Sequence, residues 1–231
     1  MSNINKEDNK SYNKIMQRLI EDLVSEGYLK TPRIINAFRH IDRADFVPEE
    51  LKFEAYVNAP LPIGFGQTIS QPSTVAFMLE LLDPKPGDKI LDIGSGSGWQ
   101  TALLAFIVSH NDEGEELEPE KEGKITTIEL IPELEMMARK NVSKYNFIKK
   151  GIVEIHCLNA TKGFSREAPF EKIIAAASTD KIPEEWKRQL NVGGIIIAPI
   201  SLSLWRYKKN EDGSFKEEEF PGFAFVPFIE G

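Results

Sequence analysis

The sequence predicts a doubly wound α/β fold with a mostly parallel sheet, a helical N-terminal cap and an antiparallel edge hairpin. Short apolar runs alternate with helical patterns between residues 89 and 200, and this alternation is typical of βαβ units. A glycine-rich turn at residues 94–98 joins the first of these runs to a helical pattern. Near the end of the chain, two strand candidates flank the polar pair Asp212-Gly213, which indicates a hairpin. The 231 residues are enough for one large domain.

The N-terminal part of the chain is predicted to be helical. The polar residues 1–11 are expected to form a disordered or frayed start. Residues 12–29 place apolar side chains at helical spacing, and we expect a helix there. A second helix is expected to begin at Thr31-Pro32, because threonine is a good N-cap and proline suits the first helical turn.

The next segment, residues 43–72, is rich in proline and glycine and predicts a long structured loop. Such loops often carry functional residues. A further helix is expected over residues 73–82. The chain is therefore expected to form one compact domain, in which N-terminal helices and a functional loop (12–82) join an α/β core (83–231).

The elements of the core follow from the hydrophobic pattern. Strands are expected at residues 89–93, 124–129, 152–158, 173–177, 195–198, 202–208 and 222–229. Helices are expected at residues 99–108, 132–145 and 183–190. The acidic residues 110–124 also contain proline and glycine, and they predict a solvated surface loop.

The net charge of the chain indicates which classes of partner to expect. The formal net charge is -8 and the sequence pI is about 5.1, whereas nucleic acids and anionic membranes attract basic surfaces. We therefore expect no nucleic acid and no membrane as partner, and no apolar run reaches the roughly 18 residues of a membrane span. The single cysteine, Cys157, excludes an intramolecular disulfide and fits a reducing compartment. The expected protein is cytoplasmic and monomeric.

The glycine-rich turn can be compared with two known nucleotide-binding motifs. A dinucleotide-binding turn requires G-x-G-x-x-G, and Gly94 and Gly96 fit it, but Trp99 stands where the third glycine belongs. A phosphate-binding P-loop requires G-K-[ST], which does not follow. Glycines in such a turn still allow the close approach of a ligand. Glu129 ends the second predicted strand, where a carboxylate can accept hydrogen bonds from ribose hydroxyls.

The pattern apolar-Asp-apolar-Gly-x-Gly-x-Gly at residues 91–98 resembles motif I of the class I methyltransferases. The cofactor of that class carries no phosphate, so the backbone approaches its amino-acid moiety and sulfonium instead. The resemblance implies that S-adenosyl-L-methionine is the cofactor. It also implies that Asp92 lies near the methionine end of the cofactor and that Glu129 binds its ribose.

A more specific resemblance extends from residue 31 to residue 229. Residues 61–72 read Leu-Pro-Ile-Gly-Phe-Gly-Gln-Thr-Ile-Ser-Gln-Pro, which resembles the signature of the protein-L-isoaspartate (D-aspartate) O-methyltransferases. The runs 43–48 and 222–228 are similar to that family in order and spacing. The family methylates the α-carboxylate of isoaspartyl residues in damaged proteins, and the ester then cyclises to a succinimide. The resemblance thus implies isoaspartyl-containing peptides and proteins as partners.

The same resemblance implies the site residues. Ser70 is the active-site serine by position. The residues expected to bind the cofactor are Gln67, Thr68, Ile69, Asp92, Gly94, Ser95, Gly96, Gly98, Glu129, Leu130, Asn159 and Ala160. The residues expected to contact the substrate are Ser70, Pro72, Ala177, Ser178 and Val226. No metal is expected, because the three histidines and the single cysteine show no metal-ligand spacing.

A carboxylate acceptor and a sulfonium donor need mainly positioning from the protein. The acceptor is already ionised at neutral pH, so no strong general base is required. Charge is neutralised as the methyl group moves, and a dry site that aligns oxygen, methyl carbon and sulfur favours the transfer. The Ser70 hydroxyl can donate a hydrogen bond to the carboxylate. Ser70 is not expected to act as a covalent nucleophile, because no G-x-S-x-G elbow surrounds it.

Three positions depart from the family's pattern. Ser73 stands where the family often has histidine, and Leu158-Asn159-Ala160 replaces the usual Gly-Asp-Gly. Asn159 still offers an amide oxygen to the adenine amino group. Residues 175–180 are one residue longer than the family's Ala-Ala-Ala-Pro loop. These departures leave open a methyltransferase with another carboxylate acceptor and a non-catalytic cofactor-binding protein, while the missing third glycine argues against a nicotinamide oxidoreductase.

Overall fold

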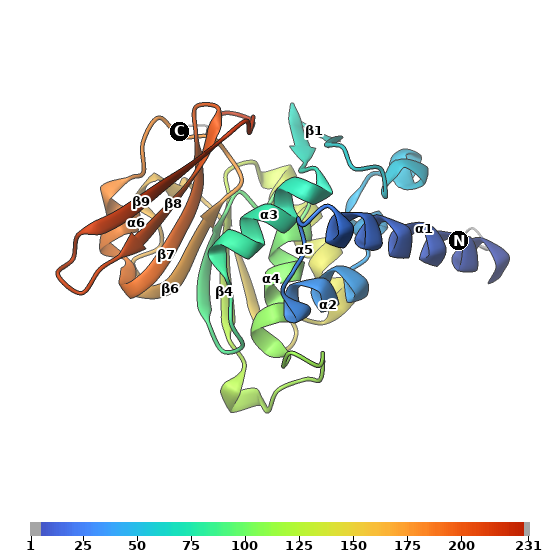
Figure 1. Ribbon diagram of the computed structural model, residues 1–231, viewed down its shortest axis with the longest axis horizontal. Helices are drawn as coiled ribbons and strands as arrows, with labels where there is room; N and C mark the ends of the chain where they lie inside the picture. Colours follow the sequence, from blue (N-terminus) through green and yellow to red (C-terminus); the bar gives the residue numbers. More distant parts are fainter. Residues whose placement is uncertain (1–5, 229–231) are drawn as a thin grey trace.

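Helices cover both faces of a seven-stranded sheet, which confirms the predicted α/β fold class (Figure 1). The computed structural model describes residues 6–228, with side chains from residue 14 onward. The first helix begins at Lys6, six residues before its predicted start. Residues 6–11 of the expected frayed start are therefore helical, and residues 1–5 lie outside the described part of the chain.

The main sheet has the strand order β5-β4-β3-β6-β7-β8-β9. The strands are β3 (Lys89–Ile93), β4 (Lys124–Glu129), β5 (Val153–Cys157), β6 (Phe170–Ala175), β7 (Leu190–Ile200), β8 (Ser203–Lys209) and β9 (Phe215–Pro221). All pairs from β5 to β7 are parallel, and β8 and β9 extend the sheet in the antiparallel sense. The mostly parallel sheet with an antiparallel edge is as the sequence predicts.

Six α-helices and five short 3-10 helices are assigned within residues 6–228. The α-helices are α1 (Lys6–Ser25), α2 (Pro32–His40), α3 (Pro72–Leu82), α4 (Trp99–Ser109), α5 (Pro132–Val142) and α6 (Glu184–Arg188). The 3-10 helices are η1 (Arg43–Phe46), η2 (Glu49–Glu54), η3 (Pro119–Lys121), η4 (Ser143–Tyr145) and η5 (Ala160–Lys162). Over this same range, no helix combines the length and the apolar character that crossing a bilayer requires.

Alternate residues of the central strands face opposite layers. In β3, Ile90 belongs to the core shared with α2 to α5, whereas Leu91 belongs to the core that holds Trp186 of α6. This alternation follows from the two-residue period of a strand. All eleven residues of α4 are buried, because α4 lies between the sheet and α2 (Figure 1). The N-terminal helices and the sheet therefore share one hydrophobic core.

The last strand lies earlier in the chain than the sequence predicts. Strand β9 pairs with β8 over residues 215–221, and the predicted strand at 222–229 is wrong for its described residues. Residues 216–219 are all charged, which is common in edge strands and conceals the strand from a hydrophobic pattern. The apolar Phe223 and Phe225 instead pack their side chains against the core.

A second, two-stranded sheet lies within the segment predicted as a loop. Strands β1 (Leu61–Gly64) and β2 (Gln67–Ile69) form an antiparallel hairpin, and β1 rises at the top of the molecule in Figure 1. The turn residues Phe65 and Gly66 both have positive φ, 54° and 70°, as the tightest hairpin turns require. Strands this short show too little alternation for a sequence pattern to reveal them.

Gly98 allows α4 and α5 to approach each other closely. Its φ is 91°, and an added Cβ would lie 2.9 Å from Val142 Cγ2 and 3.1 Å from Ala138 Cα. We expect Gly98→Ala to lower the free energy of unfolding by about 2 kcal/mol more than Gly213→Ala. Gly213 is the matched control, because its φ is 83° and no atom lies within 4 Å of its Cβ position. Denaturant unfolding checks the difference, and equal losses in the two variants would contradict the packing argument.

Candidate active site

A pocket opens at the carboxyl ends of the parallel strands β3, β4, β5 and β6. Successive strands run outward in opposite directions from the pair β3–β6, and doubly wound sheets bind ligands at such a switch point. The pocket and its mouth enclose about 860 Å³ of space, which includes open solvent. The pocket therefore has the position of a cofactor site.

Most of the site residues inferred from the sequence line this pocket. They are Gln67, Thr68, Ile69, Ser70, Gly94, Ser95, Gly96, Glu129, Leu130, Ala160, Ala177 and Val226. The others, which are not among the lining residues, are Pro72, Asp92, Gly98, Asn159 and Ser178. The fold thus brings together side chains from segments more than 150 residues apart in the sequence.

The glycine-rich loop between β3 and α4 forms one wall. Gly94 and Gly96 have φ of 84° and 51°, a region in which glycine is favoured over other residues. A Cβ added at Gly96 would lie 3.4 Å from Ile63 Cδ1 of β1, so the loop and the hairpin lie against each other. The buried Ser95 hydroxyl has no hydrogen-bond partner among the described residues, and a ligand in the pocket can supply one.

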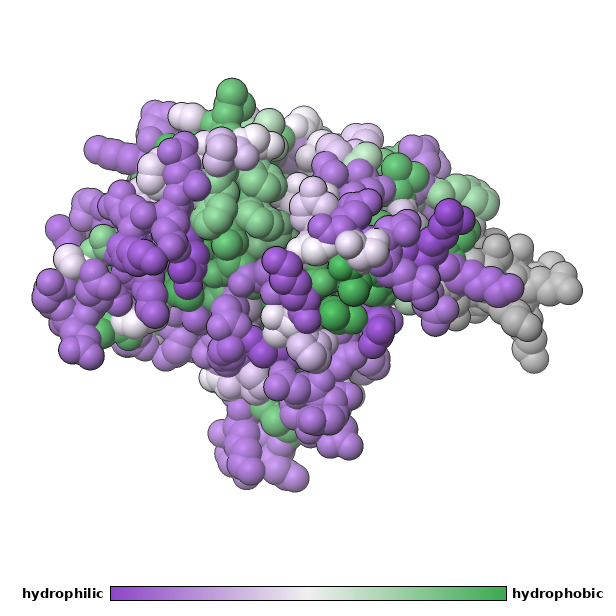
Figure 2. Space-filling model, in the orientation of Figure 1, coloured by the Kyte–Doolittle hydropathy of each residue, from purple (hydrophilic) through white to green (hydrophobic). Residues whose placement is uncertain are grey.

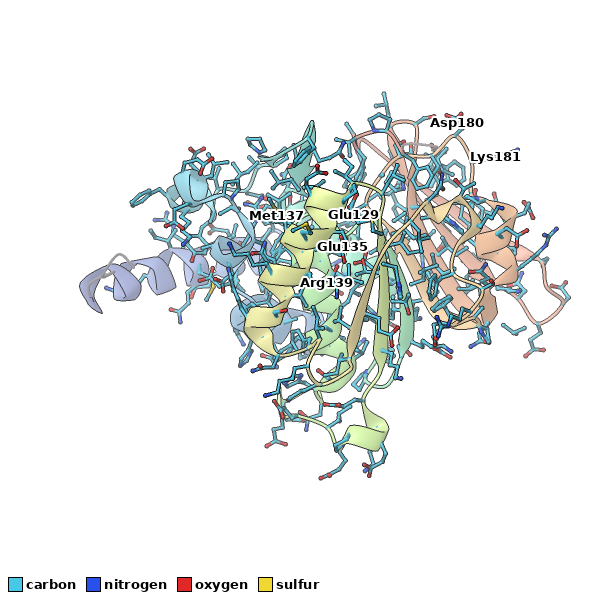
Figure 3. The ribbon with its side chains drawn as sticks, turned by 180° about the vertical axis from the view of Figure 1, so that it is seen from behind. Glu129, Glu135, Met137, Arg139, Asp180 and Lys181 are labelled. Atoms are coloured by element: carbon cyan, nitrogen blue, oxygen red, sulfur yellow. The ribbon has the colours of Figure 1, made fainter. Side chains whose placement is uncertain are left out.

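The carboxylate of Glu129 is oriented by backbone N–H groups at the end of β4. Gly96 N–H donates to Oε2 at 2.9 Å, and the N–H groups of Leu130 and Ile131 donate to Oε1 at 2.9 and 3.0 Å. A carboxylate has about four acceptor positions, so Oε2 keeps capacity for a ligand hydroxyl. Figure 3 shows Glu129 beside α5, the helix that carries Glu135 and Arg139.

Asp92 lies behind the pocket and is completely buried. Its carboxylate accepts hydrogen bonds from Gln100 Nε2 at 2.8 Å and from the hydroxyls of Thr101 and Thr127 at 2.6 and 3.1 Å. Gln100 itself lines the pocket. Any contact between Asp92 and a cofactor would therefore run through neighbouring side chains such as Gln100.

Burial makes the ionised form of Asp92 unfavourable. Desolvation raises the pKa of Asp92 from 3.8 to about 6, against the three donated hydrogen bonds, and the nearby Glu129 charge raises it further. Because the folded pKa exceeds the unfolded value, this group lowers stability as pH rises from about 4 to 6. We expect the stability of Asp92→Asn, relative to the parent, to increase across that window. Urea unfolding at several pH values checks this, and a pH-independent difference would contradict it.

Asn159 follows β5 but turns away from the pocket lining. Its amide oxygen accepts hydrogen bonds from Thr161 N–H at 2.8 Å and from the Thr161 hydroxyl at 2.6 Å. Both acceptor positions of the oxygen are thus used, and Asn159 caps η5. Leu158 and Ala160, which flank Asn159, line the pocket instead.

Ser70 follows β2 and lines the same pocket as the glycine-rich loop. Its hydroxyl forms no hydrogen bond with the part of the chain that the structure describes, so it is free to donate to a ligand. Pro72 occupies the first turn of α3. The segment thus presents one unoccupied hydroxyl beside the apolar side chains of Ile69 and Val75.

The C-terminal segment closes another side of the pocket. Ser178 N–H donates to Val226 O at 2.8 Å, and Phe228 N–H donates to Ser178 O at 2.7 Å. Ser178 therefore holds the segment through its backbone, while Val226 and Phe228 line the pocket. The loop 175–180, for which the sequence predicts one residue more than the family's pattern, contains the residue that anchors this segment.

Several lining residues were not inferred from the sequence. They are Val75, Ile93, Ser97, Trp99, Gln100, Ile128, Ile131, Leu134, Leu158, Ala176, Pro227 and Phe228. Most of them are apolar and carry no chemical motif, so only their place in the fold marks them. The family-like run at residues 222–228 was the one available signal for the last two.

The electrostatic character of the pocket favours a cation. Glu129 is the only lining residue with a formal charge among those that the structure describes, and no lysine or arginine lines the pocket. A pyrophosphate would meet a carboxylate there, whereas a sulfonium would be attracted to it. Residues 6–228 contain no cluster of three or more histidine, cysteine, aspartate or glutamate side chains placed to hold a metal ion.

Comparison with known proteins identifies the family. A sequence model of the protein-L-isoaspartate(D-aspartate) O-methyltransferase family matches residues 13–231. The chain belongs to this family. The resemblance inferred from residues 31–229 is thereby confirmed, and the family match extends it toward both ends of the chain.

Curated members of the family align over nearly their full length. A protein-L-isoaspartate O-methyltransferase from Methanopyrus kandleri is 40% identical over 227 residues, covering 96% of this chain and 95% of the relative. One from Pyrococcus horikoshii is 38% identical over 229 residues and covers 96% of each chain. The match therefore includes the N-terminal helices as well as the α/β core.

Solved structures of the family share the fold. A crystal structure from Plasmodium falciparum is described as a protein-L-isoaspartate O-methyltransferase in complex with S-adenosyl-L-homocysteine. It superposes with a TM-score of 0.79 at 23% identity, covering 93% of this chain and 98% of the other. A second structure with the same enzyme name gives a TM-score of 0.80 over 94% of this chain and 66% of its own length.

Proposed function

We propose that the chain is a protein-L-isoaspartate O-methyltransferase that transfers a methyl group from S-adenosyl-L-methionine to the α-carboxylate of L-isoaspartyl residues. The observation that carries this proposal is the pocket shared by the free Ser70 hydroxyl and the Glu129 carboxylate. Family membership supports the reaction and the class of substrate. The methyl ester then leads to a succinimide, so the product is the first intermediate of a protein repair reaction.

The pocket residues fit S-adenosyl-L-methionine. Glu129 Oε2 has acceptor capacity for a ribose hydroxyl, and the absence of a side chain at Gly96 leaves room beside the hairpin. When bound, the cofactor supplies a methyl group on a positively charged sulfur. We propose that the loop 94–97 holds its amino-acid end, and that Leu158 and Ala160 contact its adenine in place of Asn159.

The residues of the hairpin and the C-terminal segment are proposed to position the substrate. The Ser70 hydroxyl donates a hydrogen bond to the incoming carboxylate and fixes one of its oxygens. Apolar side chains such as Val226 and Val75 exclude water from the reacting atoms. Residues 12–82 thus supply Ser70 and Val75 to the acceptor side of the site. Residues 83–231 supply the donor side and also Val226 on the acceptor side. We also propose a monomeric, cytoplasmic enzyme, on the support of the acidic charge and the single cysteine.

A matched pair of peptides tests the proposed function. The protein is incubated with radiolabelled S-adenosyl-L-methionine and a peptide that contains either isoaspartate or aspartate at one position. We expect a base-labile methyl ester on the isoaspartyl peptide and none on its aspartyl twin. Transfer only to another acceptor would favour the alternative carboxyl methyltransferase, and cofactor binding without transfer would favour the non-catalytic alternative.

A further inference from the structure

A buried arginine holds the base of the β1–β2 hairpin. Arg43 of η1 is only 2% exposed. Its Nη1 donates to the carbonyl oxygens of Ala55 at 2.7 Å and Val57 at 3.3 Å. Its Nη2 donates to the carbonyl oxygens of Ala59 at 2.9 Å and Ser70 at 3.0 Å. One guanidinium group therefore binds four backbone carbonyls.

The two carbonyls bound by Nη2 stand on opposite sides of the hairpin. Ala59 precedes β1 and Ser70 follows β2, so this nitrogen joins the incoming and outgoing chains. The tip of the hairpin is a turn, and Ser70 lies outside any regular element. The Arg43 guanidinium is consequently a direct side-chain restraint on the backbone of Ser70.

The same guanidinium also contacts a second lining residue of the pocket. Its Cζ lies 5.3 Å from the centroid of the Trp99 ring, within the range of a cation–π interaction. Trp99 is the first residue of α4, directly after the glycine-rich loop, and it lines the pocket. Arg43 thus links the segment that presents the acceptor hydroxyl to the segment proposed to hold the donor.

The environment of Arg43 differs from that of Arg33, a buried arginine that forms ion pairs. No ion pair between described side chains includes Arg43, and its Nε is buried without a hydrogen-bond partner. Burial lowers its pKa to about 10. Arg33 of α2 is also buried, yet it pairs with Asp83 and Asp112. A buried cation without a carboxylate is unfavourable for folding, which indicates that the geometry at Arg43 serves another purpose.

We propose that Arg43 is a positioning residue that sets the Ser70 hydroxyl against the donor wall of the pocket. The inference rests on the proposed methyl transfer, because the reacting atoms relative to which Arg43 would position Ser70 are those of that reaction. Among side chains, only arginine has a planar fork that can donate to four carbonyls in this way. Lysine at this position would keep the charge but lose the fork, and Ser70 would move relative to Trp99.

The variant Arg43→Lys tests the proposal. We expect kcat for the isoaspartyl peptide to fall on the order of 100-fold, with a smaller change in the Kd for S-adenosyl-L-homocysteine. In the double variant with Ser70→Ala, the second substitution should cost almost nothing further, because Arg43 acts through Ser70. A purely structural role would instead make the two losses multiply. If Arg43→Lys does not fold, Arg43→Gln, which leaves no buried charge, takes its place.

The matched control is Arg33→Lys, which perturbs a buried arginine that does not line the pocket. It should lower the unfolding midpoint and leave kcat within about twofold of the parent. Amide hydrogen exchange over residues 59–70 gives a readout that does not depend on activity. Faster exchange there in Arg43→Lys, and not in Arg33→Lys, is expected. Unchanged exchange or an unchanged kcat would overturn the role of Arg43, whereas an inactive parent enzyme with the expected exchange pattern would overturn only the proposed function.

Discussion

Ser70→Ala is expected to lower kcat for an isoaspartyl peptide about 100-fold while the affinity for S-adenosyl-L-homocysteine changes little. The hydroxyl lines the pocket and forms no hydrogen bond with the described residues, so its removal should leave the fold intact. The acceptor carboxylate loses charge during transfer, so the main contribution of the hydroxyl is to orient the attacking oxygen. Initial rates with labelled cofactor measure kcat, and calorimetry measures the affinity.

Ser73→Ala is the matched control for this prediction. Ser73 lies three residues further on, is buried, and does not line the pocket. Its hydroxyl already accepts a hydrogen bond from Gln71 Nε2 at 2.9 Å. The control should therefore change kcat far less than Ser70→Ala. Equal rates in the Ser70 variant and the parent would remove Ser70 from the mechanism.

Glu129→Ala is expected to weaken binding of S-adenosyl-L-homocysteine by about 1–3 kcal/mol, the scale of hydrogen bonds to a charged group. The substitution removes the acceptor proposed for the ribose and also leaves the N–H groups of Gly96, Leu130 and Ile131 without their partner. The glycine-rich loop and the start of α5 would then lose a shared anchor. Isothermal titration calorimetry measures the loss.

Glu135→Ala separates this role from the general effect of removing a carboxylate. Glu135 lies on α5, pairs with Arg139 and is absent from the pocket lining, and Figure 3 shows both side chains on that helix. We expect the Glu135 variant to bind S-adenosyl-L-homocysteine like the parent. An equally small effect at Glu129 would mean that the ribose lies elsewhere.

One patch of the molecular surface is less polar than the rest of the visible face. Figure 2 shows apolar residues on the face that carries α3 and the C-terminal strands, surrounded by polar ones. Phe77 of α3 packs on Phe220 and Phe223, with ring centroids 5.5 and 5.2 Å apart. These contacts explain how the polar β9 can form the edge of the sheet. The strand pairs with β8 through its backbone, while the aromatic rings supply the packing.

The local hydrophobic pattern was enough to predict the elements with strong periodicity. The strands 89–93 and 124–129 have the predicted bounds, since they are short apolar runs buried between helices. Glu129 was likewise inferred for its place at the end of a strand, which is a local property. The polar strand β9 and the hairpin β1–β2 escaped prediction, because their pairing depends on partners that the hydrophobic pattern does not specify.

The amino-acid sequence by itself determined the α/β class, the glycine-rich turn, the acidic residue at the end of β4 and the membership of the family. Each of these depends on residues that are neighbours in the chain. Only the tertiary structure decided that Asp92 lies behind the pocket and that Arg43 reaches Ser70. Such contacts join segments whose separation and orientation are fixed by packing, and a linear pattern contains no information on which of several nearby polar groups a side chain will meet.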